Sequence, residues 1–256
     1  MFYFTKPVGG LYMGEALVKP PFVEYVNIGA PVRIFFASDL HIRPNTLRTA
    51  ENVISCIRSL SPDLVLFGGD FSEYDDGFLK FFELLKGVNV PMGMFSVEGN
   101  NDVTRFSGDK EKIKRVMQDA GVCLLRNECA RISLNGKKIE IAGARNAYFE
   151  TPDVKGLFSD DKSAYRILLA HEPVKKTLAD AQGRADLMLS GHTHGGQVNV
   201  MGFTCYELLG YERKFRYTHL AGMKKLSNTR VLVSRGIGTS KFAVRFGARP
   251  EVHMIT

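Results

Sequence analysis

The chain has 256 residues, and 45% of them are hydrophobic, which is enough to bury the core of a single α/β domain. Its formal net charge is +7 and its pI is near 9.2, so the composition disfavours a cationic partner and favours an anionic one. No run approaches the ~20 apolar residues that a membrane-spanning helix needs, and the N-terminus has no signal-peptide pattern, so we expect a cytoplasmic protein, with peripheral membrane contact left open.

Residues 1–31 are rich in glycine, proline and aromatic side chains, which predicts an N-terminal arm or edge strand packed on the main domain. Residues 32–256 are expected to form a single catalytic core. Continuous apolar runs predict buried strands at Val32–Ala37, Leu64–Phe67, Met92–Val97, Ile139–Ala142, Arg166–Leu169, Leu187–Leu189 and Arg230–Val233. Helical spacing predicts helices at Leu47–Leu60, Gly77–Lys86, Asp109–Ala120 and Pro173–Ala181, the first of them capped by Asn45 or Thr46. This alternation predicts a layered α/β domain.

Side chains of the types that bind metals directly follow five of the predicted strands. They are Asp39, His41, Asp70, Asn100, His171, His192 and His194. In open α/β sheets, ligands bind beyond the carboxyl ends of the strands, so we expect these side chains to meet at one edge. Core packing alone does not require metal-binding types of side chain at the ends of five strands.

The spacing within the motifs suits two metal ions. Residues i and i+2 of an extended segment point to the same side, so Asp39 and His41 can hold one ion together, and His192 and His194 can serve two adjacent ions. Asp70 is the only carboxylate directly after its strand, which suits it to bridge the pair. Imidazole, carboxylate and amide ligands fit Mn²⁺, Fe or Zn²⁺ better than Ca²⁺. The set predicts two divalent ions and a hydrolase of phosphate esters.

These motifs resemble those of the calcineurin-like metallophosphoesterase superfamily. The matching segments are Asp39-x-His41, Gly69-Asp70, Gly99-Asn100, His171 and Gly191-His192-x-His194. More narrowly, Ser38–His41, Gly191–Gln197, Val233–Ser240 and Arg249–Glu251 resemble the bacterial YaeI/YkuE-type phosphodiesterase branch. The resemblance spans about residues 32–256.

The resemblance implies a four-layer α/β/β/α sandwich with a dinuclear metal site at the carboxyl ends of the strands. It implies that the first metal is bound by Asp39, His41, Asp70 and His194. It implies that the second metal is bound by Asp70, Asn100, His171 and His192.

One position departs from the family pattern. Family members commonly have histidine after Gly-Asn, where it contacts the phosphate and can protonate the leaving oxygen; this chain has Asn101, followed by Asp102. An asparagine side chain donates hydrogen bonds but cannot supply a proton near neutral pH. We therefore expect esters with good leaving groups to be affected least. Asp102 is expected to keep a structural role.

The ligand set motivates a mechanism. Two metals ~3.5–4 Å apart would hold a bridging water and lower its pKa, and the resulting hydroxide would attack phosphorus in line. The segment from Phe203 to Arg249 is rich in Lys and Arg, and we take Arg235 and Arg245 as the first candidates to pair with phosphate oxygens.

A phosphodiester is the expected substrate, and the sequence leaves three alternatives to it. A lipid-linked diphosphate such as UDP-diacylglucosamine would use the apolar N-terminal residues as a rim for acyl chains. A nucleic-acid substrate is disfavoured because the sequence has no recognisable nucleic-acid-binding module. A metal-binding interaction scaffold with weak or lost catalysis would account for Asn101 but not for the intact ligand positions.

Overall fold

The computed structural model describes residues 8–105, 109–204 and 219–256. The first seven residues of the predicted N-terminal arm therefore lie outside the described residues. So does the stretch 205–218, which carries part of the predicted basic segment.

The first of two six-stranded sheets has the order β2-β16-β3-β4-β5-β6. Its strands are β2 (Phe22–Val26), β16 (Glu251–Ile255), β3 (Ile34–Ala37), β4 (Leu64–Phe67), β5 (Met94–Ser96) and β6 (Val122–Leu124). Strands β3 to β6 are parallel, whereas β16 runs antiparallel to β3 and pairs with β2 on its other side. The N-terminal arm thus supplies an edge strand.

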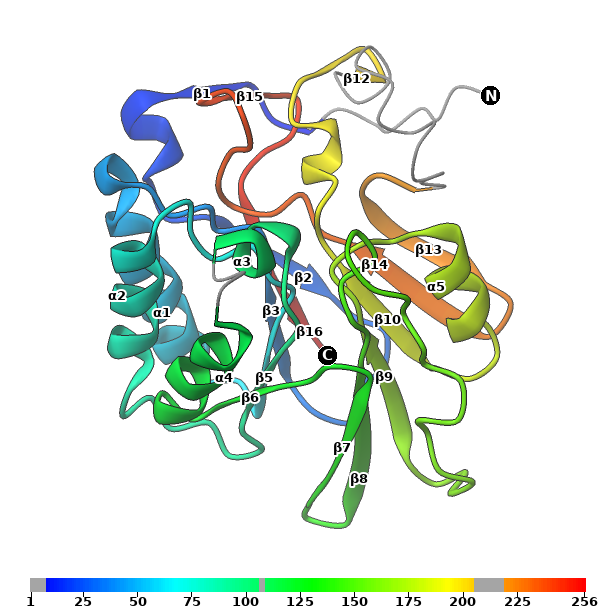
Figure 1. Cartoon of the computed structure of the whole chain (residues 1–256). Coiled ribbons are helices and arrows are strands. Elements are labelled where there is room, and N and C mark those ends of the chain that lie inside the picture. Colours follow the sequence, from blue (N-terminus) through cyan, green and yellow to red (C-terminus); the bar gives the residue numbers. More distant parts are fainter. Residues whose placement is uncertain (1–7, 106–108, 205–218) are drawn as a thin grey trace.

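The second six-stranded sheet has the order β13-β14-β10-β9-β8-β7. Its strands are β13 (Gly222–Leu226), β14 (Thr229–Val233), β10 (Leu187–Ser190), β9 (Tyr165–Leu169), β8 (Lys137–Gly143) and β7 (Glu128–Leu134). The four inner strands are parallel, and β13 and β7 are antiparallel edges. The parallel strands of both sheets end at the same side of the molecule (Figure 1).

Helices cover the outer faces of both sheets, and three buried clusters separate four layers. Helices α1 (Arg48–Leu60), α2 (Asp75–Leu85) and α4 (Lys110–Asp119) share the first cluster with the first sheet. The second cluster lies between the sheets, and the third joins the second sheet to α5 (Lys175–Ala181). The predicted α/β/β/α sandwich is confirmed (Figure 1).

The predicted cap of the first helix is wrong. A 3₁₀ turn, η2 (Pro44–Thr46), precedes α1, so that Leu47 occupies the N-cap position and makes no side-chain cap. The Thr46 hydroxyl instead accepts a hydrogen bond from the Arg43 backbone N–H at 2.8 Å. The Thr46 side chain therefore stabilises the turn η2 and does not cap α1.

Short elements surround the carboxyl ends of the strands. Strand β1 (Leu11–Met13) pairs with β15 (Val244–Phe246), β11 (Asn199–Val200) pairs with β12 (Phe203–Thr204), and η1 (Gly14–Leu17) and η3 (His194–Gly196) are 3₁₀ turns.

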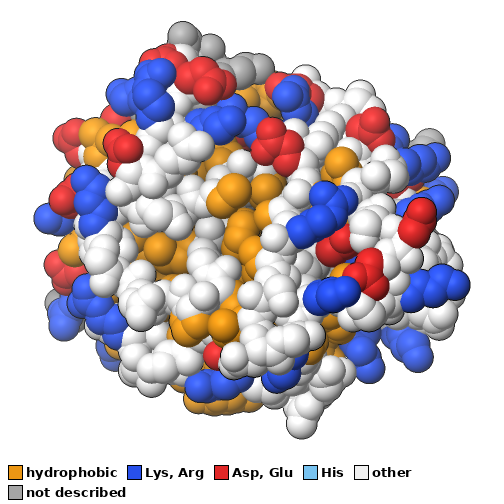
Figure 2. Space-filling view, turned by 90° about the horizontal axis from the view of Figure 1, so that it is seen from below, with side chains coloured by type: hydrophobic (Ala, Val, Ile, Leu, Met, Phe, Trp, Pro, Cys, Tyr) orange, Lys and Arg blue, Asp and Glu red, His pale blue; other side chains and the backbone are white. Residues whose placement is uncertain are grey.

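The opposite end of the molecule, seen in Figure 2, has a hydrophobic strip across its middle with charged side chains around it. In the described part of the chain, no helix combines the length and hydrophobicity needed to cross a membrane.

Candidate metal centre

The predicted ligands meet where the two sheets face each other. Asp39 and His41 follow β3 and Asp70 follows β4, so these three come from the first sheet. His171 follows β9, and the loop after β10 carries His192 and His194, so these three come from the second sheet. The seventh predicted ligand, Asn100, follows β5 of the first sheet. The side chains form two groups of three, each with ligand atoms within 4.8 Å of one another: Asp39, His41 and His194, and Asp70, His171 and His192.

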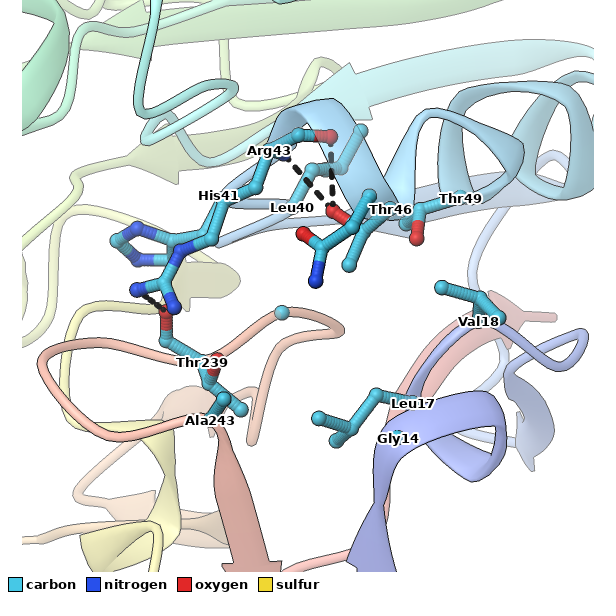
Figure 3. A pocket seen from close by; sticks show the side chains of 12 residues that line it. Gly14, Leu17, Val18, Leu40, His41, Arg43, Thr46, Thr49, Thr239 and Ala243 are labelled. Atoms are coloured by element: carbon cyan, nitrogen blue, oxygen red, sulfur yellow. Dashed lines mark hydrogen bonds between the residues drawn. The ribbon is translucent and has the colours of Figure 1, made fainter.

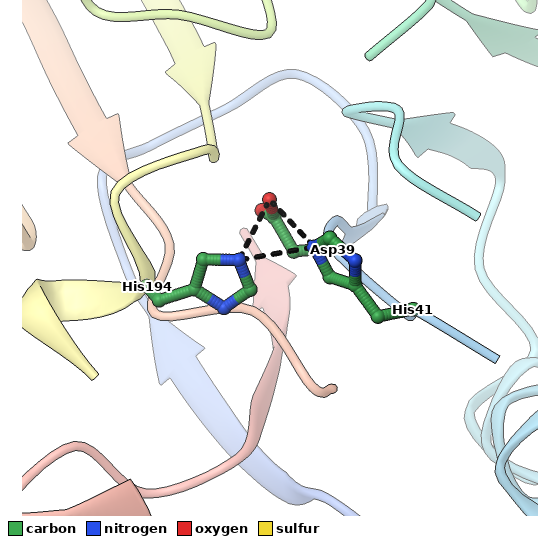
Figure 4. Close-up of side chains that lie close together, drawn as sticks. All are labelled: Asp39, His41 and His194. Carbon is green, nitrogen blue, oxygen red and sulfur yellow. Dashed lines mark hydrogen bonds and ion pairs between the residues drawn. The ribbon is translucent and has the colours of Figure 1, made fainter. Parts of the chain in front are cut away.

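The first group is compact and buried. His41 Nε2 lies 3.0 Å from His194 Nε2, and the Asp39 carboxylate lies 3.9 and 3.6 Å from these two nitrogens (Figure 4). All three side chains are almost inaccessible to solvent. Two imidazole nitrogens and a carboxylate oxygen that face one another are typical of a metal site.

Asp70 connects the second group to the first. Its Oδ2 lies 3.4 Å from His171 Nε2 and 3.5 Å from His41 Nε2. His192 Nδ1 lies 3.2 Å from His171 Nε2. One carboxylate therefore lies between histidines of both groups, as the bridging prediction requires.

The backbone at these residues is left-handed. The φ angles are +55° at Asp39, +42° at His41, +57° at Asp70, +69° at His192 and +51° at His194. Such conformations cost about 1–3 kcal/mol each in residues other than glycine, and they persist where the surrounding structure imposes them. Here five residues of the predicted ligand set share this conformation, and each lies shortly after the end of a strand.

Buried aromatic packing fixes the loop that carries Asp70. The next residue, Phe71, is fully buried, and its ring centroid lies 4.9–5.9 Å from those of Phe67, Phe78, Phe81 and Phe82. Aromatic pairs at such separations add to the stabilisation from burial. The Asp70 carboxylate is thus attached to a rigid part of the core.

Two ligands have partners that orient the ring for metal binding. His171 Nδ1 lies 2.6 Å from the Gly68 carbonyl oxygen, and His41 Nδ1 contacts the Glu73 carboxylate. A proton on each Nδ1 would be donated to these acceptors, which leaves Nε2 free to bind a cation. Sequence reasoning missed Glu73, because nothing in its spacing distinguishes it from an exposed acid.

His194 has a different partner. Arg245 Nη2 lies 2.9 Å from His194 Nδ1, and because a guanidinium only donates hydrogen bonds, this nitrogen is the acceptor. Arg245 is fully buried and also donates to the Gly238 and Ala248 carbonyl oxygens. Arg235 is held by Glu251, with Nη1 2.9 Å from its Oε2. Both arginines thus have partners within the protein, and a contact of either with substrate stays a prediction.

Two residues shortly after Gly99, Asn101 and Asp102, hold the loop of Asp70 in place. The Asn101 backbone N–H and side-chain amide donate to the two oxygens of Asp70 at 2.9 and 2.7 Å. Asp102 accepts from the backbone N–H groups of Gly99, Asp70 and Phe71 at 2.8–3.0 Å. Asp102 therefore ties the loop after β4 to the start of α3 (Asn100–Arg105).

Glycines allow these loops to approach one another. A Cβ at Gly99 would overlap the Asp70 carboxylate, and a Cβ at Gly191 would overlap Ser38 and the Asp39 carboxylate. Both glycines precede a predicted ligand directly in the sequence. Any larger side chain at either position would push two ligand loops apart.

Electrostatics favour the unprotonated form of Asp70, His192 and His194. At His41 and His171, burial is outweighed by neighbouring carboxylates, which raise the pKa of both rings in the absence of a cation. Burial would raise the pKa of Asp70, but the neighbouring His171, His41 and His192 hold it well below its usual value. Burial and the charge on His171 lower the pKa of His192 to about 3, and burial together with His41 and Arg245 lowers the pKa of His194. Neutral imidazoles and ionised carboxylates are the forms that bind metals.

The donor set fits two divalent cations. The Asn100 Oδ1 atom is buried and has no hydrogen-bond partner among the described residues. A buried acceptor without a donor carries a free-energy penalty, which a cation would remove. The Asn100 oxygen is therefore available to a cation, and its coordination to the second ion stays a prediction.

Comparisons with known proteins agree with this geometry. Residues 32–196 match the model of the calcineurin-like phosphoesterase family. The chain is 32% identical over 225 residues to the metallophosphoesterase YkuE of Bacillus subtilis strain 168, covering 86% of this chain and 76% of YkuE. It is 28% identical over 242 residues to the phosphodiesterase YaeI of Escherichia coli K12, covering 93% of this chain and 87% of YaeI.

Among solved structures, the NAD nucleotidase NadN of Haemophilus influenzae matches the fold with a TM-score of 0.51 at 14% sequence identity. That match covers 87% of this chain and 50% of NadN. The likeness to NadN concerns the fold, whereas the family match covers the five strand-end motifs. On the strength of that match, this chain is a member of the calcineurin-like phosphoesterase family.

Proposed function

We propose that this protein is a metal-dependent phosphodiesterase that works with two divalent metal ions. The position of Asp70 carries the proposal, because its Oδ2 lies within 3.5 Å of a histidine nitrogen from each group. A bridging carboxylate of this kind would hold two ions close together. The named activity of the relative YaeI supports a diester as the substrate class.

We assign the seven predicted ligands to the two ions in the way that the family resemblance implies. His41 and His194, with Asp39, would hold the first ion, and His171 and His192, with Asn100, would hold the second. Asp70 would contact both. Two ions bound there would lower the pKa of a water molecule and neutralise charge on the phosphate oxygens.

Asn101 defines what this chain can do with the leaving group. Its side-chain amide donates to Asp70 Oδ2 at 2.7 Å, so it positions the bridging carboxylate. It cannot donate a proton to a departing alkoxide, because an amide has no acidic proton near pH 7. We therefore expect fast hydrolysis only where the leaving oxygen departs as a stable anion.

The deciding experiment compares bis-p-nitrophenyl phosphate with p-nitrophenyl phosphate. Metal-stripped protein is restored with Mn²⁺, and Asp70→Asn serves as the control. Metal-dependent turnover that favours the diester and is lost in Asp70→Asn would support the proposal. Binding of two metal equivalents without turnover of either ester would favour the scaffold alternative, and full activity in Asp70→Asn would remove the bridging role.

A second candidate is a hydrolase of a lipid-linked diphosphate of the UDP-diacylglucosamine type. Its support is the exposed face of the β1–β15 ribbon, where Leu11 and Met13 are 59% and 56% exposed and Phe246, opposite Leu11, is 39% exposed. Apolar side chains grouped in this way are typical of surfaces that contact lipids or proteins. Activity that requires vesicles or detergent would favour this candidate, whereas full activity on water-soluble diesters without lipid would count against it.

A further inference from the structure

A cavity of about 150 Å³ lies beside the first group of ligands. It is enclosed by three segments that are far apart in the sequence. The arm contributes Gly14, Leu17 and Val18, the stretch after β3 contributes Leu40 to Thr49, and the loop before β15 contributes Gly238, Thr239 and Ala243. His41 lies at one end of the cavity, and Leu17 lies on the opposite side (Figure 3).

The walls differ in chemistry. Leu17 and Val18 form an apolar side, and Leu17 is 7% exposed. Across from them, the hydroxyl group of the buried Thr49 is turned toward the cavity, whereas the Thr46 hydroxyl is hydrogen-bonded to the Arg43 backbone (Figure 3). An apolar wall that faces a hydroxyl group suits a hydroxylated ring, which has apolar faces and a polar edge.

Arg43 lies beside His41 at one end of the cavity (Figure 3). Its Nη2 donates to the Thr239 carbonyl oxygen at 3.0 Å, which spans the end of the cavity nearest the metal-ligand groups (Figure 3). That bond uses one of the five N–H donors of the guanidinium. The half-buried Arg43 therefore places positive charge where the cavity meets the site.

The cavity adjoins the proposed metal centre at His41, which lines the cavity and also belongs to the first ligand group. A phosphodiester bound at the metal centre has two ester groups, and one of them would extend into a neighbouring cavity such as this one. A cavity near 150 Å³ accepts a molecule about the size of benzene, which is also the size of a sugar ring or a glycerol unit.

We propose that this cavity is a specificity subsite that receives one ester group of the substrate, a hydroxylated group about the size of a single ring. The inference rests on the proposed phosphodiesterase function. Arg43 would contact the oxygens that link this group to phosphorus, Thr49 would bond to its hydroxyl groups, and Leu17 and Val18 would pack on its apolar face.

The first test varies the ester group while the leaving group stays p-nitrophenolate. Methyl p-nitrophenyl phosphate is compared with ribose 5-(p-nitrophenyl phosphate), using Mn²⁺-loaded protein. Ala243→Phe adds a ring at the exposed mouth of the cavity, and Leu79→Phe adds one on the outer face of α2 as the matched control. We expect a kcat/KM ratio of at least 10 in favour of the sugar ester in the wild type and in Leu79→Phe, and a ratio near 1 in Ala243→Phe.

The second test needs no turnover. Calorimetric titration of the Mn²⁺-loaded protein with ribose 5-phosphate and with inorganic phosphate should show at least tenfold tighter binding of the sugar phosphate. Thr49→Val, which removes one hydroxyl at nearly constant volume, should weaken that binding about 3–10-fold and leave phosphate binding unaffected.

The outcomes separate the two proposals. If ribose 5-phosphate and phosphate bind equally to the wild type, or if Ala243→Phe keeps the wild-type substrate ratio, the subsite is refuted. If no ester is hydrolysed but the sugar phosphate binds selectively and Ala243→Phe abolishes that selectivity, the subsite stands and the phosphodiesterase proposal fails.

Discussion

Replacement of Asp102 by asparagine tests whether this carboxylate holds the second ligand group together. Oδ2 accepts from the Asp70 and Gly99 N–H groups, and Oδ1 accepts from the Phe71 N–H. The better orientation of an asparagine places its oxygen at the Oδ2 position and keeps two bonds. Its NH₂ group then faces the Phe71 N–H, so one bond is lost and two donors oppose each other.

A buried donor left without an acceptor costs about 1–3 kcal/mol, so we expect Asp102→Asn to lose that much unfolding free energy. Asp102→Ala removes the acceptor from all three N–H groups and should cost up to about 9 kcal/mol. Because Asp102 supports the loops of Asp70 and Asn100, we also expect affinity for the metal of the second group to fall about 10–100-fold, the usual cost of removing a supporting partner.

The assay is urea unfolding of the metal-free proteins followed by circular dichroism, together with metal titration. Burial and the charge of Asp70 raise the pKa of Asp102 to about 7. The assay is therefore run at pH 8, where the Asp102 carboxyl group of the wild type is mostly ionised. Asp109→Asn is the matched control: Asp109 is an exposed N-cap of α4, where asparagine caps equally well. Unfolding free energies for Asp102→Asn and Asp109→Asn that agree within about 0.5 kcal/mol would refute the reasoning.

Four further predictions follow from the same structure. Gly99→Ala should keep the native circular dichroism spectrum and lose one equivalent of bound metal, because its Cβ would overlap the Asp70 carboxylate; retention of two equivalents would contradict this. Glu251→Gln should cost about 3–5 kcal/mol at pH 7 by leaving Arg235 buried without its counter-charge. Although burial raises the pKa of Glu251, His253 and Arg235 lower it to about 2, so the wild-type advantage over this variant should be full above about pH 4.5 and disappear toward pH 2, measured by urea unfolding. Asn101→His should speed hydrolysis of methyl esters with poor leaving groups about 10²–10⁴-fold and that of p-nitrophenyl esters far less, and equal gains would refute a role in protonation. Metal at 100 times its Kd should add about 2.7 kcal/mol to the unfolding free energy, which chelation should remove, and Asp70→Asn should show a smaller gain.

The parallel strands and the ligands could be predicted because they carry strong local signals. Apolar runs such as Leu64–Phe67 are buried on both faces, and metal-type side chains directly follow them. Strand β16 gave no such signal, since Glu251 and His253 alternate with its apolar residues and are nevertheless buried. Their burial depends on partners such as Arg235 that come from elsewhere in the chain.

The role of Arg245 was equally hidden. A charged residue beside exposed apolar neighbours is typical of a surface strand, yet Arg245 points inward from β15 while Phe246 is exposed. Likewise, Glu73 has the spacing of an ordinary loop residue, and although a structural role is predicted for Asp102, its position in the sequence does not identify its partners. Only the close approach of separate loops gives them their hydrogen-bond partners.

The place of β16 has a consequence for the synthesis of the protein on the ribosome. This strand lies between β2 and β3, so residues 22–26 have no neighbour in the sheet until residues 251–255 have been made. At about 5–20 residues per second, the interval between completion of β3 and of β16 is on the order of 10–40 s. During that time the nascent chain exposes a hydrophobic edge of β3, and a chain that stops before residue 251 would leave that edge open to aggregation.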